Sequence, residues 1–232
     1  MASKKRDFHI VHQDKDLLVV DKPPGLLAVP IPGSSVKNLE TLVANFVARQ
    51  GNTISTVHRI DRFTSGLMVF AKKERTYQYL RNLFQSQQVQ RIYLAVVRDR
   101  PEPVEGELVH HMKRIKDGFR NIVVPPGDSE GTRARLQYRT RKHLDGATLL
   151  EIELDTGLKN QIRVQFAEIG HPIVGDRHYA PKEEQEPLIN RQALHAWKLK
   201  FPHPSTKQMM NFEAKKPPDF RGLLKALNTS EK

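Results

Sequence analysis

One carboxylate lies between two arginines in the stretch HRIDRFTSGLMVF, residues 58–70. Asp61 follows Arg59 by two residues and directly precedes Arg62, and the chain then passes through a Thr-Ser-Gly bend into an apolar segment. In an extended chain, Arg59 and Asp61 would share one face, with Ile60 on the other. Nearby positive charge favours the ionised carboxylate, which suits a nucleophile or a base better than a general acid. Ordinary surface ion pairs have the same spacing, so the residues alone leave both interpretations open.

The elements around this stretch follow from the apolar spacing. Residues 17–30, LLVVDKPPGLLAVP, predict two strands joined by a Pro-Pro-Gly turn. Residues 36–51 carry apolar side chains at helical intervals and end on a glycine, which predicts an amphipathic helix. Residues 55–61 and 66–72 are expected to be extended, and residues 73–88 predict a second helix.

The second half of the chain alternates like a set of antiparallel strands. Residues 91–97, RIYLAVV, predict a buried strand, and residues 104–157 predict strands with a hairpin turn at Asp145-Gly146. A short helix is expected over 160–170, with Asn160 as its N-cap and Gly170 as its stop. Then follow a polar loop EEQEP (183–187), a strand 193–204 that turns into 210–216, and a terminal helix 220–227. The sequence predicts one α+β domain over residues 1–232, with a largely antiparallel sheet, flanking helices and basic tails.

The composition narrows the class of partner. Lysine and arginine number 38 against 26 aspartates and glutamates, a net charge of +12, which indicates a polyanionic partner such as nucleic acid. The chain has no cysteine, which excludes disulfides and thiolate metal sites, and it shows neither a signal peptide nor a membrane-spanning stretch. We therefore expect a cytoplasmic protein that is not bound to a membrane.

Motifs of several enzyme classes are missing. The phosphate-loop pattern and HExxH are absent, and Ser65 does not lie in a GxSxG elbow. His110, His111 and His203 lack the partner spacing of a zinc site, so we expect them to be surface or turn residues and not metal ligands.

Four motifs in the expected order resemble the RluA-like branch of the pseudouridine synthases. HRIDRFTSGLMVFAK is similar to the family signature HRLDRxTSGLLLFAK, and LLVVDKPPGLLAVP, RIYLAVV and ALHAWKLKFPHP match three further family segments. The resemblance covers about residues 10–221. It implies a family fold with a central RNA-binding cleft and an isomerase that converts uridine in folded RNA to pseudouridine without a cofactor.

The resemblance also implies roles for individual residues. Asp61 is similar to the essential aspartate, Tyr93 to the tyrosine beside the base, and Arg163 to the arginine that pairs with the aspartate. Arg59 resembles the residue that enters the RNA stack when the target nucleotide is extruded, a step that costs a few kcal/mol. Asp61 could attack C1′, attack C6 or take a proton from C2′, and the sequence leaves these three routes open.

One segment departs from the family pattern. The usual TGRTHQIRVH is TGLKNQIRVQ here, which keeps Arg163 but alters its neighbours. Lys159 restores one positive charge, and the departure bears on which RNA is preferred.

RNA contacts are expected from the catalytic domain itself, because the first family motif begins near the start of the chain, without room for an N-terminal RNA-binding module. Basic segments 111–120 and 132–142 are candidates, although alternating arginines on an exposed strand face look the same. The predicted RNA-binding residues are His58, Arg59, Arg62, Lys113, Arg114 and Lys159.

The sequence thus predicts a monomeric RNA pseudouridine synthase that acts on structured ribosomal or transfer RNA. The alternative is a catalytically silent RNA-binding protein of the same fold, for which loss of Asp61 or Tyr93 would be expected, and both residues are present. A glycosidase would require a second, protonated carboxylate near Asp61, whereas the neighbouring charges are arginines.

Overall fold

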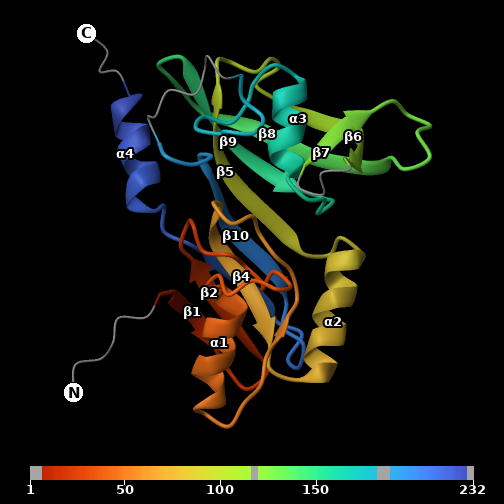
Figure 1. Ribbon diagram of the computed structural model, residues 1–232, viewed down its shortest axis with the longest axis vertical. Helices are drawn as coiled ribbons and strands as arrows, with labels where there is room; N and C mark the ends of the chain where they lie inside the picture. Colours follow the sequence, from red (N-terminus) through yellow and green to blue (C-terminus); the bar gives the residue numbers. More distant parts are fainter. Residues whose placement is uncertain (1–6, 116–119, 182–188, 229–232) are drawn as a thin grey trace. The chain divides into compact units, whose positions relative to one another are not determined.

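The computed structural model describes residues 7–115, 120–181 and 189–228 (Figure 1). The fold is α+β, and the chain divides into two compact units. The first unit comprises Met1–Gln90 and Ala196–Lys215, and the second comprises Arg91–His195 and Lys216–Lys232.

The strands of the first unit centre on β4, all seven residues of which are buried. Their order is β1-β2-β4-β10-β11, and the short β3 also pairs with β4. β1 with β2, β2 with β4, and β10 with β11 are antiparallel pairs. The strand bounds are β1 (His9–Gln13), β2 (Leu17–Lys22), β3 (Ser55–Thr56), β4 (Ser65–Ala71), β10 (Leu194–Pro202) and β11 (Met209–Glu213).

Two amphipathic helices complete this unit, and both were predicted. α1 (Leu39–Ala48) begins at Asn38, whose side chain accepts a hydrogen bond of 2.9 Å from the backbone N–H of Thr41. α2 (Glu74–Gln85) packs Leu80 and Leu83 into the same apolar cluster as alternate side chains of β2 and β4. This packing holds α2 against the strands β2 and β4.

The second unit is built on an antiparallel sheet with the order β5-β9-β8-β6-β7. The predicted hairpin turn at Asp145-Gly146 joins β8 to β9, and Gly146 takes a positive φ of 58°. α3 contacts β7, and the terminal helix α4 buries Phe220 and Leu223. The bounds are β5 (Gln90–Arg98), β6 (Glu105–Arg114), β7 (Asn121–Val124), β8 (Thr132–Leu144), β9 (Ala147–Leu154), α3 (Gln161–Glu168) and α4 (Pro218–Ala226).

The predicted hairpin over residues 17–30 is wrong in its second half. β2 forms as expected, but both of its edges are occupied by β1 and β4, so residues 26–30 cannot pair with it. Instead, the backbone carbonyls of Leu27 and Ala28 accept hydrogen bonds from Leu39 and Glu40, at the start of α1. The segment therefore satisfies N–H groups that a helix leaves without an internal partner.

Two smaller expectations also differ from the structure. The strand expected over 55–61 is limited to β3, and residues 57–60 are irregular. Asn160 precedes α3 with a left-handed φ of 57°, and its side chain makes no capping hydrogen bond. The Gln161 side chain instead holds the turn before the helix, because its Oε1 accepts from the backbone N–H of Leu158 at 3.1 Å. The predicted loop EEQEP lies outside the described residues.

Candidate active site

Asp61 lies on a tight turn at the entrance to β4. Its backbone carbonyl accepts a hydrogen bond of 3.1 Å from the N–H of Thr64, and β4 begins at the next residue. Although no strand runs through this segment, the predicted alternation holds: Arg59 is exposed, Ile60 is buried and Asp61 is half-buried. The aspartate is therefore accessible while the residue before it anchors the chain in the core.

A buried lysine that the sequence analysis did not single out fixes this turn. Lys22, at the end of β2, has no exposed surface, and its ammonium donates to the backbone carbonyls of Pro23, Leu26 and Arg62 at 2.8–3.0 Å. A buried ammonium needs such acceptors because its desolvation is costly. Lys22 thus joins the Pro-Pro-Gly loop to the residue that follows Asp61. A charged residue at the end of the apolar run LLVVDK was the available signal.

Arg62 adds a second link to the same loop. Its Nε donates to the Gly25 carbonyl at 2.9 Å, and the Gly25 N–H donates back to the Arg62 carbonyl at 2.9 Å. Its guanidinium lies 5.2 Å from the ring centre of Phe63, which is 43% exposed. The turn therefore presents an aromatic face and a cation next to Asp61.

The glycine of the Thr-Ser-Gly bend is required by packing. Gly66 has a φ of 116°, and a Cβ atom placed on it would lie 2.1 Å from the backbone carbonyl oxygen of Ala196. No side chain fits this approach of β10 to β4. The bend thus positions the start of β4, and with it the Asp61 turn.

His58, a predicted RNA-binding residue, has a packing role in the structure. Its Nε2 accepts a hydrogen bond of 3.1 Å from the backbone N–H of Val69, and its ring stacks on Phe84 at 4.6 Å between ring centres. Accepting at Nε2 places the ring proton of a neutral imidazole on Nδ1. These contacts attach the segment before Asp61 to β4 and α2, and an RNA contact of His58 stays a prediction.

In the second unit, Tyr93 lies on β5 opposite Ile152 and is 8% exposed. Arg91, two residues earlier, points to the same face of the strand, and its Nη2 donates to the Asp155 carbonyl at 2.5 Å. Burial lowers the pKa of the Arg91 guanidinium from its ordinary value. Gly157 leaves room for this group, since a Cβ there would lie 2.7 Å from Arg91 Nη1.

Arg163 is held by a buried carboxylate and an aromatic ring. Its Nε and Nη2 donate to the two carboxylate oxygens of Asp176 at 2.6 and 2.8 Å, and the guanidinium carbon lies 5.0 Å from the ring centre of Tyr179. Asp176 is fully buried, and its Oδ1 also accepts from the backbone N–H groups of His178 and Tyr179. The two-point contact fixes the plane of the guanidinium.

Asp176 and Tyr179 were not identified from the sequence. Their only local signal is an aspartate after Gly175 in the turn GDRHY. The predicted pair between Arg163 and Asp61 joins residues of different units and stays a prediction.

Comparisons with known proteins place these motifs in a family. The family model described as RNA pseudouridylate synthase matches residues 16–168, which include Asp61, Tyr93 and Arg163. The chain belongs to this family. It is 35% identical to the uncharacterized RNA pseudouridine synthase YlyB of Bacillus subtilis, over 98% of this chain and 75% of that protein.

Two further likenesses agree with this assignment. The chain is 33% identical to the ribosomal large subunit pseudouridine synthase D of Zymomonas mobilis, over 97% of this chain and 74% of that protein. The structure of human RNA Pseudouridylate Synthase Domain Containing 4 is similar with a TM-score of 0.76 at 25% identity, covering 94% of this chain and 92% of that one. The protein is thus an RNA pseudouridine synthase, an isomerase, of the RluA-like branch.

For this synthase, the predicted RNA-binding residues of the second unit fall into two groups. Lys113 is already paired, because its ammonium lies 2.7 Å from Asp128 and 3.7 Å from Glu130, and the hydrogen bond to Asp128 raises the pKa of Lys113. Arg114 is exposed at the end of β6.

The structure brings Arg114 and Lys159 to the same place through Asn121. Asn121 is the strand partner of Arg114, and its side-chain amide donates to the Lys159 carbonyl at 2.8 Å. Lys159 lies in the segment that departs from the family pattern. RNA contacts of these residues stay predictions.

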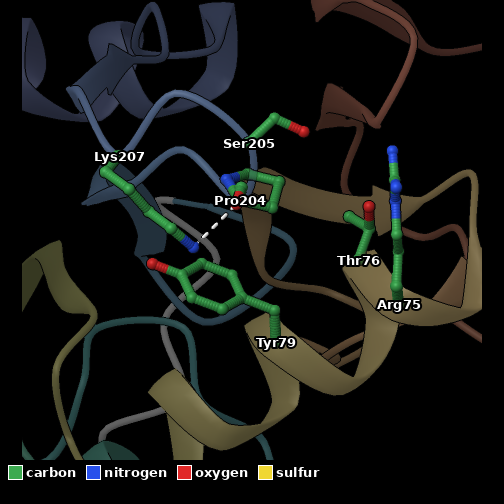
Figure 2. Close-up of a pocket in the computed structure, with 6 residues that line it drawn as sticks. All are labelled: Arg75, Thr76, Tyr79, Pro204, Ser205 and Lys207. Carbon is green, nitrogen blue, oxygen red and sulfur yellow. Dashed lines mark hydrogen bonds between the residues drawn. The ribbon is translucent and has the colours of Figure 1, made fainter.

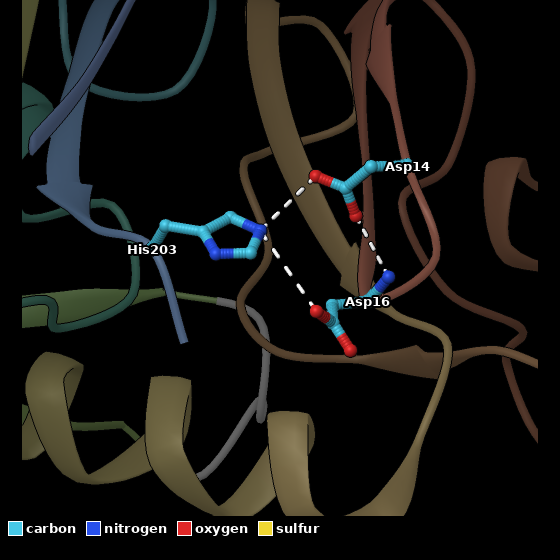
Figure 3. A group of neighbouring side chains, drawn as sticks. All are labelled: Asp14, Asp16 and His203. Atoms are coloured by element: carbon cyan, nitrogen blue, oxygen red, sulfur yellow. Dashed lines mark hydrogen bonds and ion pairs between the residues drawn. The ribbon is translucent and has the colours of Figure 1, made fainter. Parts of the chain in front are cut away.

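Asp14, Asp16 and His203 form the one cluster in the described part of the chain that could hold a metal ion (Figure 3). Asp16, however, is already bound by the Lys73 ammonium at 2.8 Å and by the Ser205 hydroxyl at 2.6 Å. A metal ion would compete with this ammonium. The cluster fits an ion-paired brace between the turn after β1 and the turn after β10 better than a metal site.

Asp14 is saturated with hydrogen bonds as well. Burial raises its pKa, but hydrogen bonds from His12, from His203 and from two backbone N–H groups outweigh burial and lower the pKa to about 2. A carboxylate with such partners remains ionised at neutral pH without a metal.

In the residues described, the structure contains no helix that is long and apolar enough to cross a membrane.

Proposed function

We propose that the protein isomerises a specific uridine in structured RNA by extruding the nucleotide and attacking it with the ionised carboxylate of Asp61. The observation that supports this most is the Asp61 turn, where a half-buried carboxylate sits on backbone fixed by the buried Lys22 ammonium. Such fixation matters because a positioned nucleophile reacts far faster than a mobile one. Attack at C1′, attack at C6 and proton removal from C2′ are all open to this carboxylate.

Four other side chains complete the proposed mechanism. Arg59, exposed two residues before the aspartate, enters the space left by the extruded base. Tyr93 lies beside the uracil while the N1–C1′ bond breaks and C5 bonds to C1′; C5 then loses its proton and N1 gains one, so that the product is an isomer of the substrate. Arg163 provides the cation for Asp61, and Asp176 keeps that cation oriented. We propose that the two units act as one catalytic domain, as a monomer in the cytoplasm.

Ribosomal RNA is the first substrate to test, with transfer RNA as the alternative. The support is the likeness to proteins from Zymomonas mobilis and Nitrosomonas europaea that are named ribosomal large subunit pseudouridine synthase D. The test is to map pseudouridines in total RNA from cells with and without the gene. A position that loses its pseudouridine in the deletion and regains it with the wild-type gene identifies the substrate.

The decisive variant is Asp61→Asn. The amide keeps the size of the side chain but not its charge, so isomerisation should be abolished while RNA binding stays within about tenfold. Asp145→Asn, which removes the same charge from an exposed hairpin turn, should retain full activity. Near wild-type turnover of Asp61→Asn would remove Asp61 from the mechanism.

A further inference from the structure

A concave site apart from the Asp61 turn lies in the first unit, where the N-terminal turn of α2 meets the turn between β10 and β11 (Figure 2). The pocket has a volume of about 430 Å³. Its two charged side chains are both cations, and the rest of its lining is neutral. The lining residues are Arg75, Thr76, Tyr79, Pro204, Ser205 and Lys207.

The start of α2 gives this pocket an affinity for anions. The twelve-residue helix begins after Lys73, whose side chain makes no capping hydrogen bond. The first N–H groups of a helix have no partner within the helix and carry a partial positive charge. Glu74, the acidic residue of this first turn, is not part of the pocket lining, and its carboxylate accepts a hydrogen bond from Gln78 at 2.6 Å.

Thr76 supplies an independent sign of a missing ligand. Its side chain is 1% exposed, and its hydroxyl has no hydrogen-bond partner in the part of the chain that the structure describes. A buried hydroxyl without a partner is unfavourable and uncommon in folded proteins. In Figure 2 the hydroxyl oxygen of Thr76 points into the space between Arg75 and Pro204, whereas the Ser205 hydroxyl donates to Asp16. An anion with acceptor oxygens would satisfy the Thr76 hydroxyl.

Lys207 is held at the pocket by an unfavourable backbone conformation. Its φ of 61° lies in the left-handed region, which favours glycine. In this conformation its ammonium lies 3.8 Å from the ring centre of Tyr79 and donates to the Pro204 carbonyl at 2.8 Å. Among the described residues, no carboxylate pairs with Lys207. The turn thus keeps a cation at the pocket, in a backbone conformation that glycine would adopt at lower energy.

The nearest buried carboxylate does not cancel this charge. Asp16 accepts from Ser205, but its charge is already balanced by Lys73 at 2.8 Å, with Arg75 more distant at 3.8 Å. The side chain of Arg75 is 73% exposed, so it can turn towards an incoming anion. The ion-paired brace described above therefore supports the wall of the pocket and leaves Arg75 and Lys207 available.

We propose that this pocket binds a backbone phosphate of the RNA substrate, which deepens the function proposed above and rests on it. Its place in the unit suits that role: Asp61 precedes β4 and the pocket follows it, and a seven-residue strand spans roughly 20 Å. A phosphate bound here anchors the RNA far from the extruded uridine. Phosphate contacts fix position and orientation without reading sequence.

Two substitutions separate binding from folding, because each removes something unfavourable to the fold. Lys207→Gly relieves the left-handed backbone, and Thr76→Val replaces an unpaired buried hydroxyl with a methyl group. Both variants should therefore unfold at the same urea concentration as the wild type, or at a higher one. At the same time, each should weaken binding of a stem-loop of the mapped substrate, Lys207→Gly by about tenfold.

The salt dependence shows whether the lost contact is to phosphate. Lys207→Gly should make the log–log slope of RNA affinity against salt shallower by roughly 0.7. Lys200→Gln removes the same charge from an exposed site on β10 outside the pocket, and it should leave affinity and slope unchanged. Equal effects of the two lysine variants would mean a general charge effect and would overturn the proposal.

Ethylation of RNA phosphates locates the contact. Wild-type protein should reject RNA ethylated at a small set of phosphates, and Lys207→Gly should lose that rejection at one or two of them while keeping the others. If Lys207→Gly still rejects every ethylated RNA that the wild type rejects, the proposal is overturned. The proposal would also be overturned if inorganic phosphate binds to this pocket while Lys207→Gly leaves the affinity for RNA unchanged. The pocket would then be a site for free phosphate.

All binding is measured in the Asp61→Asn background, where no turnover occurs if the proposed function is correct. The turnover number of pocket variants that retain Asp61 should match the wild type at saturating RNA, with a raised KM. Activity that survives Asp61→Asn would refute the catalytic proposal and leave the pocket result standing, so the two failures are distinguishable.

Discussion

The Asp61 turn and the surroundings of Arg163 hold charged groups in opposite ways. At the turn, the buried group is a lysine whose ammonium donates to three backbone carbonyls, while Arg59 and Arg62 are exposed. Around Arg163 the arginine itself is buried and is bound by the carboxylate of Asp176. The first arrangement fixes the backbone and leaves its arginines accessible, whereas the second fixes the arginine.

This difference indicates two different roles for arginine in this protein. An exposed arginine can change conformation and enter an RNA stack, because it gives up few protein contacts when it moves. A buried arginine with a two-point carboxylate contact is an oriented positive charge that costs no reorganisation during the reaction. We therefore expect substitutions around Arg163 to affect stability and chemistry together, and substitutions of Arg59 to affect only RNA handling.

The largest effect is expected from breaking the buried pair. Arg163→Met leaves Asp176 as an unpaired buried carboxylate and should lower the free energy of unfolding by about 3–5 kcal/mol. Isomerisation by the folded fraction should fall roughly a hundredfold or more. Urea unfolding and single-turnover assays measure the two losses.

The double substitution Arg163→Met with Asp176→Leu tests whether the two losses are separable. Replacing a buried ion pair with apolar side chains is often neutral for stability, so most of the lost stability should return, apart from the hydrogen bonds that Asp176 accepts from the backbone N–H groups of His178 and Tyr179. Isomerisation should remain low because the oriented cation is missing. Full recovery of activity in the double variant would assign Arg163 a purely structural role.

The sequence predicts those parts of the two regions that depend on neighbouring residues. It does not predict the parts that depend on residues far away in the chain. β4 and α2 are predicted correctly because the spacing of their own apolar residues determines them. Residues 26–30 look equally strand-like, but β2 already has β1 and β4 on its two edges, and that competition is not local. The partners of Lys22 and Arg163 escape prediction for the same reason, because Arg62 is 40 residues from Lys22 and Asp176 is 13 from Arg163.

A smaller effect is expected at Arg59, and it should be limited to extrusion of the target base. Arg59→Ala should change the free energy of unfolding by less than about 0.5 kcal/mol, because the side chain is exposed. Turnover should fall because the cost of extruding the base, a few kcal/mol, is no longer offset by the inserted side chain. Arg49→Ala, an exposed arginine at the end of α1, serves as the control and should have no effect.

An RNA whose target uridine is already unstacked sharpens this comparison. It should rescue Arg59→Ala, because the lost contribution is to extrusion. It should not rescue the Arg163 and Asp176 double variant, whose defect lies in the chemical step. Equal rescue of both would contradict the division between mobile and fixed arginines.

The smallest effect concerns two neighbouring cations of β6. It tests whether a cation held by carboxylates contributes less to RNA affinity than an exposed one. Lys113 is paired with Asp128 and Glu130, whereas Arg114 is exposed near Lys159. Lys113 gains little when it leaves Asp128 and Glu130 to meet a phosphate, because one ionic contact replaces another, whereas the exposed side chain of Arg114 can turn towards the RNA. Arg114→Gln should therefore make the log–log salt slope of RNA binding shallower by roughly 0.7, and Lys113→Gln should change it by much less. Lys116, in the same basic segment, lies outside the described residues. Measuring the RNA affinity of each variant across a salt series separates the contribution of Lys113 from that of Arg114. A Lys113→Gln slope as shallow as that of Arg114→Gln would show that its carboxylate partners do not withhold Lys113 from RNA.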